Sequence, residues 1–74
     1  MKNIRYTAVL EKEGNGYVAI CPELDVVSQG DTVEEARANL VEAVQLFLET
    51  ASHEEIEERY NPDIYITAFE VAVG

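Results

Sequence analysis

The chain has 74 residues, of which five are Lys or Arg and fifteen are Asp or Glu, so its formal net charge is −10. A chain this short forms one domain, residues 1–74, and buries only about 60% of the surface that its unfolded form exposes. Small domains of this kind are commonly reinforced by association, and we therefore expect a homo-oligomer, either a dimer or a tetramer. The acidic surface repels phosphate groups, which disfavours direct binding of nucleic acid or anionic membranes.

Cysteine and histidine each occur once, as Cys21 and His53. A single cysteine cannot form an intramolecular disulfide, which excludes a secreted disulfide scaffold. The two side chains are too few for a structural zinc site, and we expect no metal and no cofactor. No apolar run approaches the roughly 20 residues of a membrane span, and charges interrupt the N-terminal stretch where a signal peptide would be apolar. These features predict a cytoplasmic protein.

The first half of the chain predicts three strands. Residues 4–11 alternate between apolar and polar side chains, which is typical of a strand with one buried face. Residues 14–16, Gly-Asn-Gly, predict a tight hairpin turn. Residues 17–21 then form the second strand, which Pro22 ends because proline has no N–H to donate. A corner over 22–25 leads into a short third strand over residues 26–29.

A helix is predicted to follow from Thr32 to about Ala51. Thr32 and Glu35 have the spacing of a capping box, in which the hydroxyl accepts from the Glu35 N–H and the carboxylate accepts from the Thr32 N–H. Asp31 is interpreted as part of the same helix start. Gly30 lies at the sharp turn before it, where a positive φ can be required.

This helix has one broad apolar face, typical of a helix that covers a sheet. Two residues depart from the pattern. Arg37 lies at the margin of the apolar stripe, where it either snorkels over apolar surface or contacts a partner. Leu46 lies on the polar side, as a single exposed apolar residue or as part of an oligomer interface.

Residues 52–60 offer a second capping box, Ser52 to Glu55, followed by a dense run of glutamates. They predict either a short second helix or the continuation of one bent helix, ended by Asn61-Pro62. His53 is expected to be an exposed residue near the cap rather than a general base. The acidic run is either a steering patch for a basic partner or a solvated helix face; its members are Glu54, Glu55, Glu57 and Glu58.

Residues 64–73 predict the last strand, with apolar side chains on both faces. A bare edge strand of this length is an aggregation hazard, so we expect it to pair with or pack on another subunit. The predicted interface residues are Tyr65, Phe69, Val71 and Val73, together with Leu46. The expected fold is α+β, with the element order β-β-β-α-β, a four-stranded mixed sheet in the order 3-2-1-4 and one long helix on one face.

Several short motifs together resemble the HicB-like antitoxin domain over most of the chain, more weakly after about Thr50. They are Tyr6 in the first strand, Gly16-Tyr17-Val18-Ala19, Cys21-Pro22-Glu23-Leu24, Ser28-Gln29-Gly30-Asp31-Thr32 and Glu34-Glu35-Ala36. The resemblance implies a partial ribonuclease-H-like fold, an oligomer, and a small, basic, double-stranded-RNA-binding-domain-like toxin that cleaves RNA and that the domain silences. Full antitoxins of this family usually add a C-terminal DNA-binding module, which we do not expect in a chain ending at Gly74.

The leading functional hypothesis is a non-catalytic binding module that neutralises a small basic RNA-cleaving toxin through an acidic oligomeric surface. The alternative is a stand-alone homo-oligomer that binds a ligand or acts as a scaffold, without a toxin partner. A nuclease of this fold would need converging carboxylates on its strands to hold two metal ions. The first predicted strand offers residues 5–9, Arg-Tyr-Thr-Ala-Val, where an acidic ligand belongs. We therefore expect no enzymatic activity and no catalytic residues.

Overall fold

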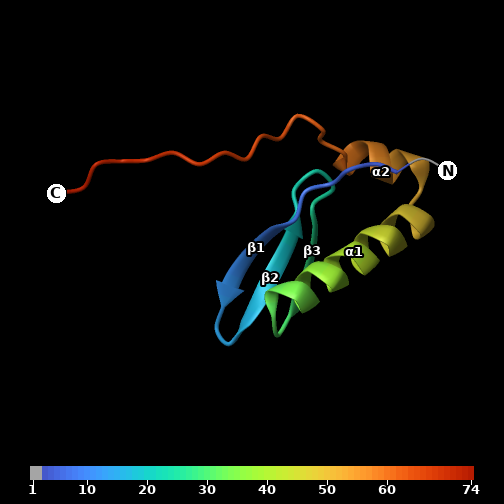
Figure 1. The fold of residues 1–74 in the computed structure, drawn as a ribbon. Coiled ribbons are helices and arrows are strands. Elements are labelled where there is room, and N and C mark those ends of the chain that lie inside the picture. The colour runs from blue at the N-terminus through green and yellow to red at the C-terminus, as the bar shows by residue number, and fades with distance from the viewer. Residues whose placement is uncertain (1–2) are drawn as a thin grey trace.

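The computed structural model describes residues 3–74. A three-stranded antiparallel sheet is covered on one face by a long helix, a short helix follows, and the last residues run outward as an extended tail (Figure 1). In chain order, the elements are β1 (Val9–Glu13), β2 (Gly16–Cys21), β3 (Val26–Gly30), α1 (Val33–Thr50) and α2 (His53–Arg59).

The strands form the predicted meander, in the order β1-β2-β3. The β1–β2 hairpin closes through two residues between Glu13 and Gly16, which are paired in register. Gly14, the first of the two, has a φ of 60°, the position at which a type II′ turn requires glycine. β1 begins only at Val9, so the prediction of a strand from residue 4 is wrong for residues 4–8, which lack strand pairing.

The long helix begins where the sequence predicts. The Thr32 hydroxyl accepts a hydrogen bond from the Glu35 N–H at 3.0 Å, which satisfies one of the free donors of the first turn. The Glu35 carboxylate accepts from the Asp31 N–H at 3.4 Å, one residue earlier than the predicted Thr32 N–H. The helix ends at Thr50, and Ser52 caps α2 by accepting from the Glu55 N–H, so residues 52–60 contain a separate helix.

The core lies between the sheet and α1. Its fully or almost fully buried side chains are all apolar and small or medium in size: Ala19, Cys21, Leu24, Ala36, Leu40 and Val44. α1 packs mainly on β3 and β2 and only slightly on β1. The β1 side of the helix is therefore less well covered than the β3 side.

Gly30 is required for close packing rather than for an unusual backbone angle. Its φ is not positive, which corrects the prediction made from its place before the helix. A Cβ at this position would lie 2.5 Å from the Ala36 nitrogen and 2.9 Å from the Ala36 Cα. The end of β3 can approach the first turn of α1 this closely because residue 30 has no side chain.

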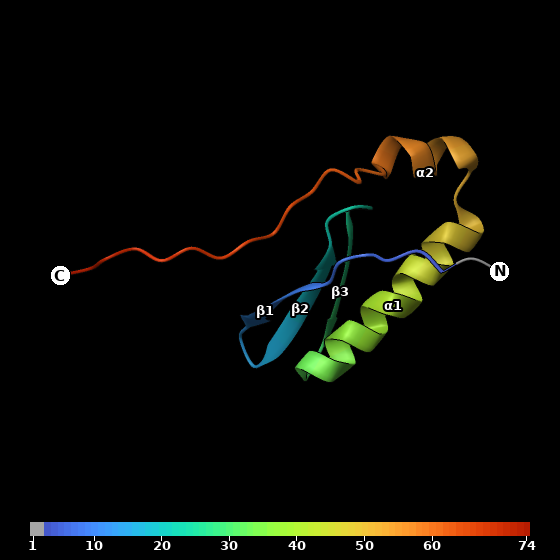
Figure 2. The same ribbon diagram turned by 45° about the horizontal axis from the view of Figure 1, so that its top comes forward.

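The predicted fourth strand is absent from the described residues 3–74. Residues 64–73 pair with no strand, so the prediction of a four-stranded mixed sheet in the order 3-2-1-4 is wrong. The Asn61 N–H donates to the Glu23 carbonyl at 2.7 Å, and Pro62 follows directly. From this point the chain leaves the body of the domain instead of returning along β1 (Figures 1 and 2).

Glu23, in the corner between β2 and β3, holds the N-terminal segment in place. Its carboxylate accepts from the Thr7 N–H at 3.0 and 3.1 Å, and also from the Thr7 hydroxyl. Burial by itself raises the pKa of the Glu23 carboxyl, but the hydrogen bonds from Thr7 outweigh it and leave the pKa below its ordinary value. The N-terminal segment, residues 3–8, is therefore anchored at Thr7 although it belongs to no strand.

Replacing Gly30 with alanine is expected to lower the free energy of unfolding by about 1–3 kcal/mol, because the new Cβ would collide with the backbone of Ala36. The measurement is urea denaturation followed by circular dichroism. Gly74→Ala is the control, since a Cβ there meets nothing within 4 Å and should leave stability unchanged. Equal stability of Gly30→Ala and the wild type would contradict the packing constraint.

Glu23→Gln is expected to cost about 1–3 kcal/mol of folding free energy at pH 7, since the bonds from Thr7 go to a charged acceptor. Folding lowers the pKa of the Glu23 carboxyl, so its ionised form stabilises the protein at pH values above the pKa that this carboxyl has in the unfolded chain. This stabilisation disappears as the pH falls through the lower pKa that the carboxyl has in the folded protein. The stability difference between Glu23→Gln and the wild type should therefore shrink below about pH 4.5.

Glu11→Gln removes the same charge from an exposed position on β1 and is the matched control. Denaturation curves measured between pH 3 and 7 for all three proteins separate the local effect from the general effect of net charge. A pH-independent difference between Glu23→Gln and the wild type would contradict the role of the charged carboxylate.

Candidate functional site

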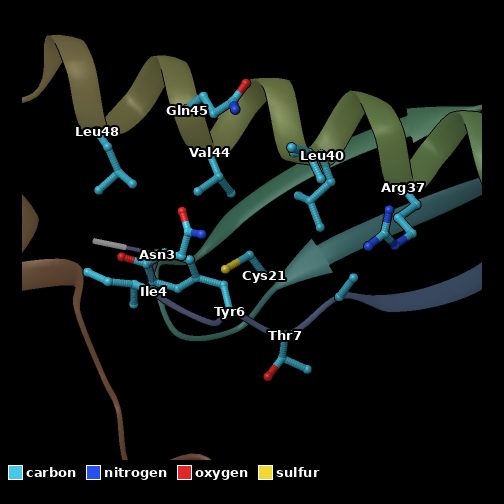
Figure 3. A pocket seen from close by; sticks show the side chains of 12 residues that line it. Asn3, Ile4, Tyr6, Thr7, Cys21, Arg37, Leu40, Val44, Gln45 and Leu48 are labelled. Carbon is cyan, nitrogen blue, oxygen red and sulfur yellow. The ribbon is translucent and has the colours of Figure 1, made fainter. Parts of the chain in front are cut away.

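A groove of about 420 Å³ runs between the N-terminal segment and α1. Figure 3 shows the helix on one side of it, the segment on the other and Cys21 between them. Most of the surfaces that enclose it are hydrocarbon. The main side chains of the helix wall are Arg37, Leu40, Val41, Val44 and Leu48, and those of the opposite wall are Ile4, Tyr6 and Ala8.

The groove exists because the helix is displaced toward β3. On the β1 side, Val41 is 43% exposed and Ile4 is 58% exposed, although both residues face into the space between helix and segment. In Figure 3 Thr7 points away from the helix, toward the side on which Glu23 holds it. The hydrogen bonds of Thr7 thus fix one wall of the groove.

Two ionisable side chains at the groove, Cys21 and Tyr6, are kept uncharged. Burial, opposed in part by the Leu24 N–H, raises the pKa of the Cys21 thiol, whose Sγ lies 3.6 Å from the Glu23 carboxylate. Burial also raises the pKa of the Tyr6 hydroxyl, with smaller contributions from Tyr60, Cys21 and Glu23. A protonated thiol is a poor nucleophile, so these groups suit the binding of apolar side chains better than covalent chemistry.

The acidic run predicted from the sequence lies on α2. Its four glutamates, Glu54, Glu55, Glu57 and Glu58, are all exposed. Arg59 fastens this helix to the body of the domain: its guanidinium lies 4.8 Å from the centre of the Phe47 ring and donates to the Asp25 carbonyl at 3.3 Å. Arg59 thus contacts the body of the domain, and the four glutamates, all exposed, make the surface of α2 predominantly negative.

The structure does not bring Arg37 to this acidic helix. Arg37 lies in the second turn of α1, whereas α2 follows the other end of that helix, roughly 20 Å away along its axis. Arg37 instead lines one end of the groove and is exposed. The arginine and the glutamates predicted as partner contacts therefore belong to two separate surfaces.

The residues predicted as oligomer contacts also divide between two places. Leu46 is 60% exposed on the side of α1 that bears Glu42 and Glu49, away from the groove. The other four lie on the tail and are even more exposed: Tyr65 87%, Phe69 85%, Val71 68% and Val73 92%. Exposure alone does not identify an oligomer contact. The tail carries a larger exposed apolar surface than Leu46 does.

Sequence reasoning missed the groove and the Glu23–Thr7 contact. The two partners are sixteen residues apart, and no local pattern signals their pairing. It also missed a hollow of about 440 Å³ at the hairpin end of the sheet, whose lining includes three acidic residues: Glu13 from β1, and Asp31 and Glu35 from the start of α1. A signal was available only for Asp31 and Glu35, which lie together in the helix-start motif.

Residues 3–74 contain neither a metal-binding cluster nor a membrane-spanning helix. No group of three or more His, Cys, Asp or Glu side chains in this part of the chain is arranged to hold a metal ion. Neither of its helices is long and apolar enough to cross a membrane.

The chain is similar to several curated bacterial proteins. A UPF0150 protein of Synechocystis is 49% identical over 55 residues, which cover 69% of this chain and 70% of the relative. A UPF0150 protein of Helicobacter pylori is 39% identical over 66 residues, covering 88% of this chain and 92% of the relative. No protein-family model and no solved structure matches the chain. The identity and coverage of these relatives show that the chain belongs to the UPF0150 family.

Proposed function

We propose that this chain is a non-catalytic, antitoxin-like binding module of the cytoplasm that neutralises a small basic RNA-cleaving protein. The observation that carries the proposal is the exposed acidic helix α2, in which four of seven residues are glutamates and the arginine is turned toward the body. The resemblance of the motifs around the corner and the helix start to HicB-like domains points in the same direction.

Charge complementarity supplies the physical basis of this function. A protein with a formal charge of −10 attracts a basic partner over several ångströms, which raises the association rate and discriminates against acidic competitors. An RNA-cleaving protein needs a basic surface to bind phosphate groups. A dense row of carboxylates can occupy that surface and compete with RNA for it without any chemical step by the antitoxin.

The proposed chemistry requires no nucleophile and no general base. The one thiol, that of Cys21, is buried and has a raised pKa. The carboxylate with a displaced pKa, that of Glu23, is engaged by Thr7 and holds the N-terminal segment. Both groups are thus accounted for by the fold, and inhibition would result from steric and electrostatic blocking alone.

The test is to mix the chain with the purified small basic product of an adjacent reading frame and to measure association by stopped-flow fluorescence at low and high salt. The quadruple variant E54Q/E55Q/E57Q/E58Q is expected to associate about tenfold more slowly at low salt. It should also relieve the inhibition of RNA cleavage at matched concentrations.

The matched control is E11Q/E13Q/E42Q/E49Q, which removes four exposed carboxylates from β1 and α1 and changes the formal charge equally, from −10 to −6. It should retain most of the association rate. If both variants slow association equally, the net charge of the protein determines the association rate, and the surface of α2 has no special role. Absence of any complex at low salt would overturn the proposed function.

A further inference from the structure

The tail carries an apolar surface that its own domain does not cover. Residues 64–73 extend from the body as a single strand-like segment, and the longest dimension of the molecule is 51 Å as against 28 and 22 Å for the others (Figure 1). Along such a segment, alternate side chains lie on the same side. One side carries Tyr65, Thr67, Phe69, Val71 and Val73, of which all but Thr67 are large apolar residues 68–92% exposed.

The same domain has a second apolar surface, onto which such a segment could dock. The groove between residues 3–8 and α1 is apolar, open along the β1 side, and about 420 Å³ in volume. Beside it, β1 is an edge strand, paired on one side by β2 and unpaired on the other within the described part of the chain. Such an edge presents a row of free N–H and C=O groups to an incoming extended segment.

The two features agree in length. The ten residues of the tail, when extended, span roughly 33 Å. The receiving surface comprises the groove wall at residues 3–8 and the free edge of β1, which together have eleven residues and a similar extended reach. An added strand commonly gains affinity from backbone hydrogen bonds and specificity from pockets for alternate side chains, and the groove beside the edge offers such a pocket.

The path of the tail points to another molecule. The Asn61–Glu23 hydrogen bond and Pro62 set the exit of the chain, and from there the tail runs away from α1, which forms one wall of the groove (Figures 1 and 2). Each copy thus has one tail and one groove. Two copies can satisfy both through a closed twofold exchange, in which each tail is received by the groove of the other copy.

We propose that two copies of this chain form a dimer by exchanging their tails, so that residues 64–73 of each lie along the free β1 edge of the other and in the groove between its N-terminal segment and α1. Phe69 and Val71 face the groove, and Val41 of the receiving copy lies at its rim. This proposal does not depend on the toxin-binding function. It concerns the groove, whereas that function concerns α2.

The first experiment is sedimentation equilibrium of full-length proteins over a range of concentrations. The wild type is expected to be a dimer. F69S/V71S should raise the dimer dissociation constant by roughly tenfold or more, because two large apolar side chains no longer leave water on docking. A68S/A72S alters two residues on the opposite side of the tail and should have little effect. All four positions are exposed, so the folding of the monomer should be unchanged.

The groove is tested from its own side with V41E and L46E. Both replace an exposed apolar residue of α1 with glutamate, but Val41 lines the groove and Leu46 lies on the other side of the helix. V41E should weaken the dimer as much as F69S/V71S does, and L46E should not. Weakening by L46E alone would overturn the proposal in favour of an interface on the outer side of α1.

A mixing experiment separates exchange from other modes of association. F69S/V71S keeps an intact groove and V41E keeps an intact tail, so together they can form one complete tail–groove pair. With one protein labelled with a fluorophore, the mixture should give a heterodimer that is tighter than either homodimer. Failure of the mixture to associate, or a wild type that stays monomeric at all concentrations, would overturn the proposal.

Discussion

Glu23 is the contact on which the arrangement of the outer parts of this domain depends. Its carboxylate holds Thr7, and its carbonyl accepts from the Asn61 N–H, so a single corner residue positions both the N-terminal segment and the start of the tail. It also lies 3.6 Å from the Cys21 thiol at the edge of the core. Removing the side chain would free one wall of the groove while leaving the sheet and helix in contact.

The small core explains why such peripheral contacts matter. Six side chains form its centre, and the largest fully buried ones are Leu24 and Cys21. A domain that buries so little has a small margin of stability, and each hydrogen bond to a charged group is a sizeable part of it. The close approach of Gly30 to Ala36 has the same importance, because it lets α1 lie flat on β3 and so closes the better-packed half of the core.

Local patterns predicted the parts of the fold that depend on local interactions. The glycine turn, the Thr32 and Ser52 caps and the stripe of α1 each involve neighbours within a few residues, and the structure contains all of them. The tail shows the limit of such reasoning. Its alternation is a genuine signal of an extended segment, but whether that segment pairs depends on a distant edge, which no local pattern specifies.

The groove and the Glu23–Thr7 contact could not be predicted from the sequence, for a related reason. Whether Thr7 comes within reach of Glu23 in space depends on where the first strand begins. The ends of strands are difficult to place from sequence alone. Arg37 illustrates the consequence. Its place at the margin of the apolar stripe was recognised, but only the displacement of α1 toward β3 shows that this margin is the rim of an open groove.

The two proposed interactions respond to salt in opposite ways, and this follows from their chemistry. Binding of a basic partner to the glutamates of α2 gains from attraction between opposite charges, which added salt screens. Docking of tails brings together two chains of formal charge −10, so salt screens a repulsion while the apolar contact in the groove persists. The proposed dimer would therefore persist under conditions that release a basic partner, because the two surfaces lie on different elements and depend on different forces.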